Sequence, residues 1–278
     1  MEIAIVSGKG GTGKTTVAVS LALSNKGAHL LDADVDEPNC ALFLGLNNKV
    51  VGISEIPNPI IDKEKCTLCG KCSSSCQYHA LIKLPEEILL FDKMCHGCGV
   101  CSFVCPENAI TEKPREIGKI YEGKNDEILF HYGELIVGEE LTTPVIARLK
   151  DEISACDEIV IIDAPPGSAC PMVETVSDMD FIILVGEPTP FGLSDMKIVV
   201  ETLRLLNLPF GVIINKDGVG DAELENYCNK ENIPILLKIP FDLEIAKSYS
   251  TGKPLVEAIP TYQKDFQEVI HKIKEMIE

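Results

Sequence analysis

The chain has 278 residues, of which 45% are hydrophobic, so it can bury one large domain or one ordinary domain with a smaller module. It carries 25 basic and 43 acidic side chains, a net charge of −18, which argues against nucleic acid and anionic lipid as general partners. The first residues, MEIAIVSG, lack the features of a signal peptide, and no stretch reaches the roughly 18 apolar residues of a membrane span. We therefore expect a cytoplasmic protein without membrane attachment, in which twelve cysteines favour metal binding over disulfides.

Short apolar runs alternate with amphipathic stretches along most of the chain. The runs expected as buried strands are 2–6, 29–33, 158–164, 181–187, 210–215 and 235–240. The stretches expected as helices are 14–25, 143–155, 193–206, 221–232 and 260–278. This alternation predicts an α/β fold with a mostly parallel sheet and helices on both faces. The last helix has one apolar face and one face of mixed charge, which favours packing on the core over binding to a membrane surface.

A glycine-rich loop follows the first strand and precedes the first helical stretch. It reads GKGGTGKT from Gly8 to Thr15 and fits the phosphate-binding motif G-x-x-x-x-G-K-[ST] in the required context. The glycines let backbone N–H groups converge on phosphate oxygens, and the helix N-terminus adds its positive end. We expect Lys14 to reach the terminal phosphates and the Thr15 hydroxyl to bind Mg²⁺. The residues expected to contact the nucleotide here are Gly8, Gly10, Gly11, Thr12, Gly13, Lys14, Thr15 and Thr16.

Two cysteine runs interrupt this pattern between about residues 57 and 114. They read CTLCGKCSSSC (66–76) and CHGCGVCSFVC (95–105), and all four cysteine positions repeat with an offset of 29 residues. Prolines flank this duplication, which predicts an inserted module at 58–114 between two parts, 1–57 and 115–278, of a nucleotide-binding domain. The spacing C-x2-C-x2-C-x3-C suits [4Fe–4S] clusters. Zinc is the alternative, because paired C-x2-C motifs also form tetrahedral sites.

A second lysine inside the phosphate loop, Lys9, indicates which family of phosphate-loop proteins the chain resembles. The stretch KGGTGKT resembles the deviant Walker A motif of the MinD/ParA/nitrogenase-iron-protein superfamily, and the resemblance extends over essentially the whole chain. It implies that Lys9 reaches across a homodimer interface to the partner's nucleotide, where its charge offsets that of the phosphates during hydrolysis.

The same resemblance extends to two switch regions. The stretch LLDADVDEPN (30–39) resembles the first switch, which implies that Asp34 positions the attacking water and that Asp32 helps to hold Mg²⁺ through water. The stretch IVIIDAPPG (159–167) resembles the Walker B motif and second switch. It implies that Asp163 binds Mg²⁺ through water and that Gly167 senses the γ-phosphate.

Base recognition is expected at the stretch INKDG (214–218), where the family places its purine contacts, and Asn215 is the candidate. Guanine-selective proteins use N-K-x-D, but the fourth position here is Gly218 and Asp217 stands one place early. ATP is therefore favoured over GTP. The stretch IPFD (239–242) resembles the second base-side loop of the family.

The cysteine runs resemble those of bacterial ferredoxins, and a ferredoxin module inserted into a MinD-like ATPase is a known arrangement in the family. In such folds the fourth cysteine of each run binds the other cluster. The resemblance assigns one [4Fe–4S] cluster to Cys66, Cys69, Cys72 and Cys105, and the other to Cys95, Cys98, Cys101 and Cys76. One departure is Gln77, which stands where ferredoxins have a proline after the cysteine, whereas Pro106 is present at the equivalent position.

Four cysteines lie outside the runs, and buried packing is expected for all of them: Cys40, Cys156, Cys170 and Cys228. Cys170 has an alternative role. It lies seven residues after Asp163, the spacing at which nitrogenase iron protein carries a cluster ligand that bridges its dimer.

These features imply a Mg²⁺-dependent ATPase that couples ATP-driven homodimerisation to electron transfer or metal-cofactor assembly, with a redox partner or target metalloprotein. Two alternatives stay open. One is an iron–sulfur cluster carrier of the Mrp type, although the C-terminal C-x-x-C pair of those proteins is absent here. The other is a positioning ATPase of the MinD/ParA type with structural clusters. Since the strand before Asp34 is expected to lead directly into the cysteine module, we expect movement of this loop on hydrolysis to shift that module against its partner.

Overall fold

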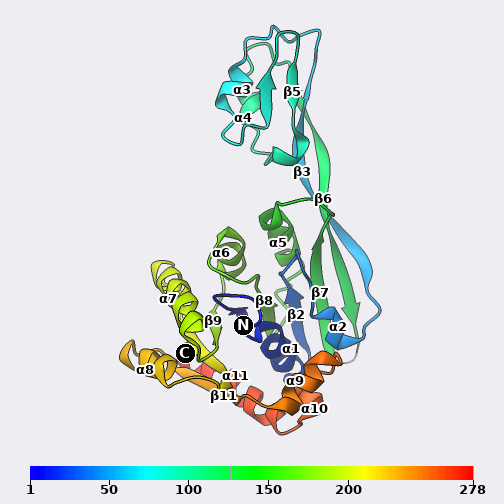
Figure 1. Cartoon of the computed structure of the whole chain (residues 1–278). Helices are drawn as coiled ribbons and strands as arrows, with labels where there is room; N and C mark the ends of the chain where they lie inside the picture. Colours follow the sequence, from blue (N-terminus) through cyan, green and yellow to red (C-terminus); the bar gives the residue numbers. More distant parts are fainter. Residues whose placement is uncertain (126, 278) are drawn as a thin grey trace.

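A nine-stranded sheet forms the centre of the protein (Figure 1). The structure is a computed structural model and describes residues 1–125 and 127–277. The strand order is β11-β10-β9-β1-β8-β2-β7-β6-β3. The strands are β1 (Glu2–Val6), β2 (Ala28–Asp32), β3 (Lys49–Ile61), β6 (Ile110–Lys124), β7 (Ile128–Leu135), β8 (Val160–Asp163), β9 (Phe181–Gly186), β10 (Phe210–Asp217) and β11 (Ile235–Pro240).

Seven of these strands, from β11 to β7, are parallel, and their apolar side chains are buried from both sides. One face packs against α5 (Thr142–Lys150), α6 (Cys170–Val176), α7 (Pro190–Leu205) and α8 (Glu223–Lys230). The other packs against α1 (Lys14–Ser24), α10 (Leu255–Ala258) and α11 (Tyr262–Ile277). The predicted α/β fold with helices on both faces is confirmed. Two short helices, α2 (Ala41–Leu44) and α9 (Leu243–Ser250), lie beside the latter group.

The last helix, α11, packs on the core as expected, because Phe266, Val269, Ile270 and Ile273 are buried. Its final turn departs from the prediction, since Ile277 is 41% exposed. In the described part of the chain, none of the helices combines the length and the apolarity needed to cross a membrane.

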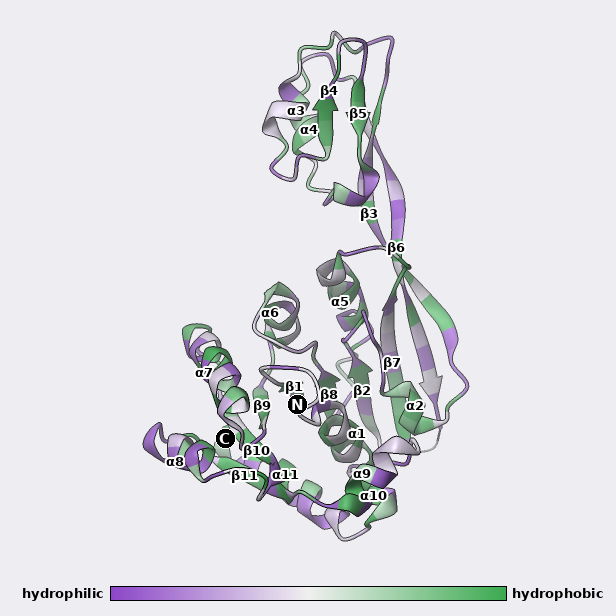
Figure 2. Cartoon of the chain, in the orientation of Figure 1, coloured by the Kyte–Doolittle hydropathy of each residue, from purple (hydrophilic) through white to green (hydrophobic). Residues whose placement is uncertain are grey.

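The strands β3, β6 and β7 were not predicted. β7 joins the sheet parallel to β2, and β6 and β3 then extend the sheet in antiparallel fashion. Beyond β7, β3 and β6 continue alone as a two-stranded ribbon, which carries residues 62–109 away from the main body (Figure 1). The prolines at the predicted module boundaries lie inside these strands, where Pro57 and Pro114 are direct partners. Figure 2 shows why sequence patterning missed them: the ribbon mixes polar and apolar residues, whereas the central strands are uniformly apolar.

The residues 62–109, here called the cysteine-rich segment, contain only short elements: α3 (Lys71–Ser75), β4 (Leu81–Lys83), β5 (Ile88–Leu90), the 3₁₀ helix η1 (Asp92–Met94) and α4 (Val100–Phe103). Its two halves repeat in backbone conformation as well as in sequence. Left-handed residues recur at the same 29-residue offset, in the pairs Leu68 and Gly97, Gly70 and Gly99, and His79 and Asn108. The internal duplication is therefore visible in the fold.

The first switch strand does not lead directly into the cysteine-rich segment, contrary to expectation. Residues 33–48, including α2, and the whole of β3 lie between the end of β2 and that segment. Any route from Asp34 to the cysteines must therefore pass through contacts in space.

Candidate nucleotide site and cysteine cavities

A cavity of about 500 Å³ opens at the carboxyl ends of the parallel strands, beside the phosphate loop. Ligands bind at this edge in open α/β sheets, because loops after the strands converge there. The lining includes Lys9, Gly10, Gly11, Gly13, Lys14, Thr15, Thr16, Asp34 and Asn215. The remaining predicted nucleotide contacts, Gly8, Thr12 and Gly167, are not part of this lining.

The loop geometry depends on Gly13, which caps α1 with φ of 95°. A Cβ atom at this position would lie 2.1 Å from the amide nitrogen of Asn215, so no other residue fits. That amide nitrogen donates a 2.7 Å hydrogen bond to the carbonyl of Thr12. Asn215, expected to contact a purine, thus also fixes the shape of the phosphate loop.

Lys14, Thr15 and Asp163 form a buried group at the start of α1. Lys14 Nζ donates a 2.7 Å hydrogen bond to one carboxylate oxygen of Asp163, and the Thr15 hydroxyl donates a 2.6 Å hydrogen bond to the other. Burial alone would lower the pKa of Lys14, but the carboxylates of Asp163, Asp32 and Asp34 together outweigh it and raise that pKa, with Asp163 contributing most. Lys14 is therefore a fixed positive charge at the cavity wall.

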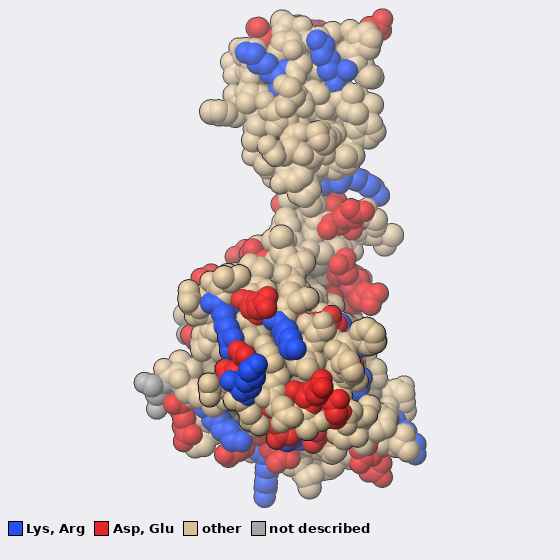
Figure 3. All heavy atoms as spheres, turned by 60° about the vertical axis from the view of Figure 1, so that its left-hand side comes forward, with Lys and Arg blue, Asp and Glu red and all other residues tan. Residues whose placement is uncertain are grey.

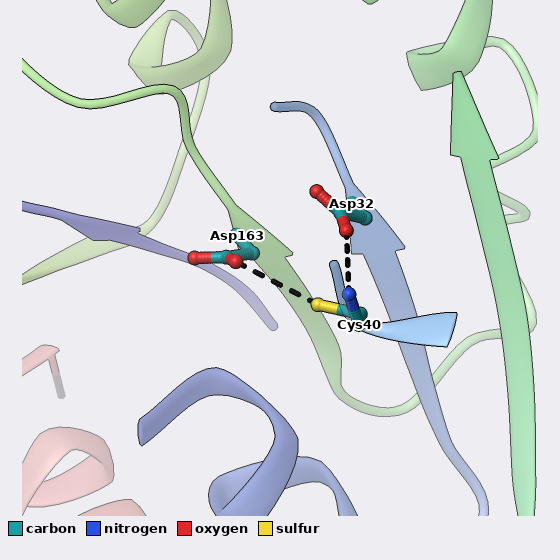
Figure 4. A group of neighbouring side chains, drawn as sticks. All are labelled: Asp32, Cys40 and Asp163. Atoms are coloured by element: carbon teal, nitrogen blue, oxygen red, sulfur yellow. Dashed lines mark hydrogen bonds between the residues drawn. The ribbon is translucent and has the colours of Figure 1, made fainter. Parts of the chain in front are cut away.

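Asp32 lies behind this group and organises the first switch (Figure 4). Its carboxylate accepts hydrogen bonds from the backbone N–H groups of Asn39 and Cys40 at 2.8 and 2.9 Å, and from that of Asp34 at 3.1 Å. Burial raises the pKa of Asp32 to about 7, and the neighbouring Asp163 adds to this effect. Its observed contacts are thus with the backbone of residues 34–40.

Cys40, which sequence reasoning left as a packing residue, is fully buried and belongs to the same group. Its thiol donates a hydrogen bond to Asp163 at 3.6 Å (Figure 4). Burial, and to a smaller extent the carboxylates of Asp32 and Asp163, raise the pKa of this thiol well above its usual value. It is held as a neutral thiol.

The two switch residues differ in their availability. Asp34 lines the cavity, 3.8 Å from Lys14 Nζ, and burial raises its pKa to about 6. In contrast, the N–H of Gly167 donates a 2.8 Å hydrogen bond to the carbonyl of Ser7. A phosphate contact by this N–H requires that bond to break.

Lys9 lies at the mouth of the cavity, where it pairs with Glu187, directly after β9. Lys216 pairs with the other oxygen of Glu187 at 2.9 Å and also donates to the carbonyl of Gly11 at 2.8 Å. Burial alone would raise the pKa of Glu187, but the two lysines outweigh it and lower that pKa. Sequence reasoning missed Glu187. Its position directly after a parallel strand could have placed it at the carboxyl edge of the sheet, where the cavity lies. Figure 3 shows basic and acidic side chains intermixed over the face of the main body turned forward there.

The far end of the cavity is largely apolar. Phe241 and Asp242 come from the predicted second base-side loop, and Ile245, Tyr249 and Leu255 follow on α9 and α10. An apolar wall with few polar groups suits a flat aromatic base.

Two smaller cavities in the cysteine-rich segment bring the eight cysteines of the runs together in two sets of four. One is lined by Cys66, Cys69, Cys72 and Cys105, and the other by Cys76, Cys95, Cys98 and Cys101. Each set takes three cysteines from one run and the fourth from the other, which is the crossed arrangement expected from the ferredoxin resemblance. We call these sets the outer set (with Cys66) and the inner set (with Cys95). All twelve cysteines lie in the described part of the chain, and none forms a disulfide.

The donor atoms of both sets fit a cluster of metal ions. Four thiols converge on each cavity, and the backbone N–H of Ala109 already points at Cys105 Sγ, 3.3 Å away, as N–H groups do toward cluster sulfurs. Burial raises the pKa of the Cys101 thiol to about 11 in the metal-free chain. A bound cation removes this cost, because metals bind the thiolate.

Among the other four cysteines, Cys40 and Cys228 are buried as expected. The same expectation is wrong for Cys156 and Cys170, which are exposed. Cys156 lies in the turn before β8, and Cys170 begins α6 directly after the second switch, so neither side chain reaches the core.

The sheet order, the phosphate loop with its strand and helix, and the carboxylates after β2 and β8 define a P-loop ATPase of the MinD/ParA type. Residues 3–255 match the family described as CobQ/CobB/MinD/ParA nucleotide binding domain, and the chain belongs to this family.

Relatives and solved structures resemble the chain over nearly its full length. A protein of Methanocaldococcus jannaschii, named only as uncharacterized, is 36% identical over 282 residues, which span 100% of this chain and 98% of that one. An iron-sulfur cluster carrier protein of the same organism is 25% identical over 303 residues, which span 100% of this chain and 85% of that one. The septum site-determining protein MinD of Pyrococcus horikoshii, solved with Mg-ADP, has a TM-score of 0.58 at 20% identity, covering 99% of this chain and 96% of that one. This last likeness shows a shared fold.

Proposed function

We propose that the protein is an ATP-hydrolysing iron–sulfur protein that couples an ATP-driven homodimer to electron transfer or to metal-cofactor assembly. The observation that carries this proposal is the crossed arrangement of the two cysteine sets, on a ribbon that continues the ATPase sheet. Sets of four cysteines in which the fourth comes from the other run are the ligand pattern of two-cluster ferredoxins.

At the nucleotide site, Lys14 would bind the terminal phosphates, and Thr15 and Asp163 would hold Mg²⁺, which supplies charge neutralisation for phosphoryl transfer. Since Lys14 and Thr15 now bond to Asp163, entry of the nucleotide has to replace these two hydrogen bonds. Asp34 lines the cavity and would orient the attacking water. Asn215 and the apolar wall near Phe241 would hold adenine.

Lys9 is proposed to serve the partner's nucleotide in the dimer. Within one chain it pairs with Glu187, so its transfer to a partner requires this ion pair to open. Dimerisation therefore competes with the ion pair between Lys9 and Glu187.

The outer and inner sets would each hold one [4Fe–4S] cluster, which supplies one-electron transfer when bound. The chain's part is to supply the thiolates and to donate a backbone N–H group toward a sulfur, as Ala109 does toward Cys105.

The coupling is tested by redox titration of the anaerobically purified protein, followed by EPR, with and without Mg·ATP in wild type and in Lys14→Ala. We expect a nucleotide-dependent shift of cluster potential or of the reduction rate of an acceptor, in wild type only. Identical potentials and rates in all four states would overturn the coupling.

A second candidate function is delivery of an iron–sulfur cluster to other proteins. It is favoured by the 25% identical relative that is named an iron-sulfur cluster carrier protein. Incubation of the loaded protein with an apo-ferredoxin distinguishes the two functions. Transfer of iron to the acceptor supports a carrier, whereas reduction of an acceptor without loss of iron supports electron transfer.

A further inference from the structure

The inner and outer cysteine sets have different surroundings, although their sequences are duplicated. The loop that carries Cys95 and Cys98 lies directly against the ribbon, because a Cβ atom at Gly97 would be 2.9 Å from the carbonyl oxygen of Pro57. The equivalent residue in the outer set is Leu68, which adopts the same left-handed conformation with a full side chain. The inner position therefore has no room for a side chain against the ribbon, whereas the outer position accommodates leucine.

A buried ion pair holds the same inner loop. Arg115 of β6 donates a 3.2 Å hydrogen bond to the carbonyl of Cys95, and its guanidinium also pairs with Glu139 in the loop between β7 and α5. The side chains of Arg115 and Glu139 are only 17% and 4% exposed. A charged group that donates to the backbone of a cluster-binding loop fixes the position of that loop.

The loop that contains Glu139 is in turn bound to the first switch. The carbonyl of Val35, next to Asp34, accepts a 3.0 Å hydrogen bond from the N–H of Leu135, the last residue of β7. Val35 also fills the space over Gly133, where a Cβ atom would lie 2.7 Å from its side chain. Glu139 follows Leu135 by four residues, and its carboxylate accepts hydrogen bonds from the N–H groups of Glu140 and Leu141.

We propose that Arg115 and Glu139 are positioning residues that couple the first switch to the inner cysteine set, and that the inner set alone responds to nucleotide. This inference rests on the proposed function. The route runs from Asp34 and Val35 through the end of β7 to Glu139, Arg115 and Cys95. Its steps are hydrogen bonds, one ion pair and short stretches of covalent chain. The outer set has no comparable bond to the main body among the described residues.

The test is hydrogen–deuterium exchange of the iron-loaded protein with and without a non-hydrolysable Mg·ATP analogue. In wild type we expect exchange in residues 95–99 to change by at least about fivefold on binding, and that in residues 66–70 to stay the same. Arg115→Lys and Glu139→Gln should lose this response while keeping their iron content and analogue affinity. Lys63→Met, which breaks the 3.1 Å pair with Glu87 in the outer half, is the matched control and should keep it.

Redox titration gives a second readout that a merely structural role would not move. In wild type and in Lys63→Met, the analogue should shift the potential of one of the two clusters. In Arg115→Lys it should shift neither potential. Equal responses of both loops, or an unchanged response in both Arg115→Lys and Glu139→Gln, would overturn the inference. Binding of the analogue without a response in residues 95–99 would overturn this inference alone, whereas failure to bind the analogue or iron would overturn the proposed function as well.

Discussion

The ammonium group of Lys14 lies 2.7 Å from a carboxylate oxygen of Asp163, with both side chains buried at the end of the central strand β8. The carboxylates of Asp32 and Asp34 also interact with this ammonium group and help to raise its pKa. Lys14 therefore stabilises the fold itself, in addition to the phosphate contact proposed for it.

Substitution of Lys14 by methionine should leave buried carboxylates without a counter-charge. We expect Lys14→Met to lower the free energy of unfolding by about 3 kcal/mol, the usual cost of breaking a buried pair. Urea denaturation without nucleotide measures this. Lys14→Met combined with Asp163→Asn should recover part of the loss, and exposed Lys26→Met is the control. A loss below about 0.5 kcal/mol would contradict the role assigned to this pair.

Loss of the carboxylate of Glu187 should make Lys9 easier to transfer to a partner chain. We expect Glu187→Gln to strengthen dimerisation with a non-hydrolysable ATP analogue by roughly fivefold, the worth of about 1 kcal/mol for a partly exposed pair. Sedimentation velocity measures the dimer. Lys9→Ala should weaken it, and weaker dimerisation in both variants would contradict the prediction.

The crossed cysteine sets predict a pattern of iron loss. Each [4Fe–4S] cluster holds four irons, so Cys105→Ser should lower the iron content from about eight to about four per chain. Cys66→Ser added to it should cause little further loss, because both residues line the outer cavity. Cys95→Ser added instead should remove nearly all iron. Cys156→Ser is the control, and full loss in the first double variant would argue against the crossed sets.

Gly97 and Gly27 both adopt positive φ, 66° and 81°, but only Gly97 faces a close neighbour. Alanine at either position costs about 1 kcal/mol for the left-handed backbone. At Gly97 it also meets the carbonyl of Pro57, so Gly97→Ala should cost an additional 1 kcal/mol or so. Thermal unfolding of the two variants gives the comparison, and equal losses would show that the inner loop has room to move.

A pair of buried histidines predicts a pH dependence of stability. His29 Nε2 and His131 Nδ1 lie 2.8 Å apart, and burial, with a smaller contribution from His29, lowers the pKa of His131 below 6.5. The unfolded chain therefore binds more protons just below pH 6.5, and stability should fall as the pH falls through this window. In His131→Gln this part of the fall should disappear.

The raised pKa values of Asp32 and Asp34 give a slope of opposite sign, because these groups favour folding more as they become protonated. That slope is common to both proteins, so the difference between them isolates His131. Urea denaturation at several pH values from 5 to 7.5 measures it. Parallel curves for wild type and His131→Gln would exclude the effect.

The sequence was sufficient to predict those strands and loops whose structure depends on one contiguous pattern of residues. The apolar strands and the loop around Lys14 are of this kind, because burial on both faces and the phosphate motif each leave a contiguous signature. The ribbon was missed since Lys113, Pro114 and Arg115 follow one another in a mostly exposed stretch of β6, without the apolar run of a buried strand. The ion pair of Glu139 with Arg115 joins residues 24 positions apart, and no spacing rule predicts such a contact.

The two ends of the cysteine-rich segment meet as direct partners, Ile61 with Ile110, at the last rung of the ribbon. In topological terms the segment is the enlarged tip of a hairpin, and a short turn in its place would leave every strand of the main body intact. A gene could therefore acquire or discard these 48 residues in a single event without disturbing the catalytic scaffold, which makes the segment a transferable cassette.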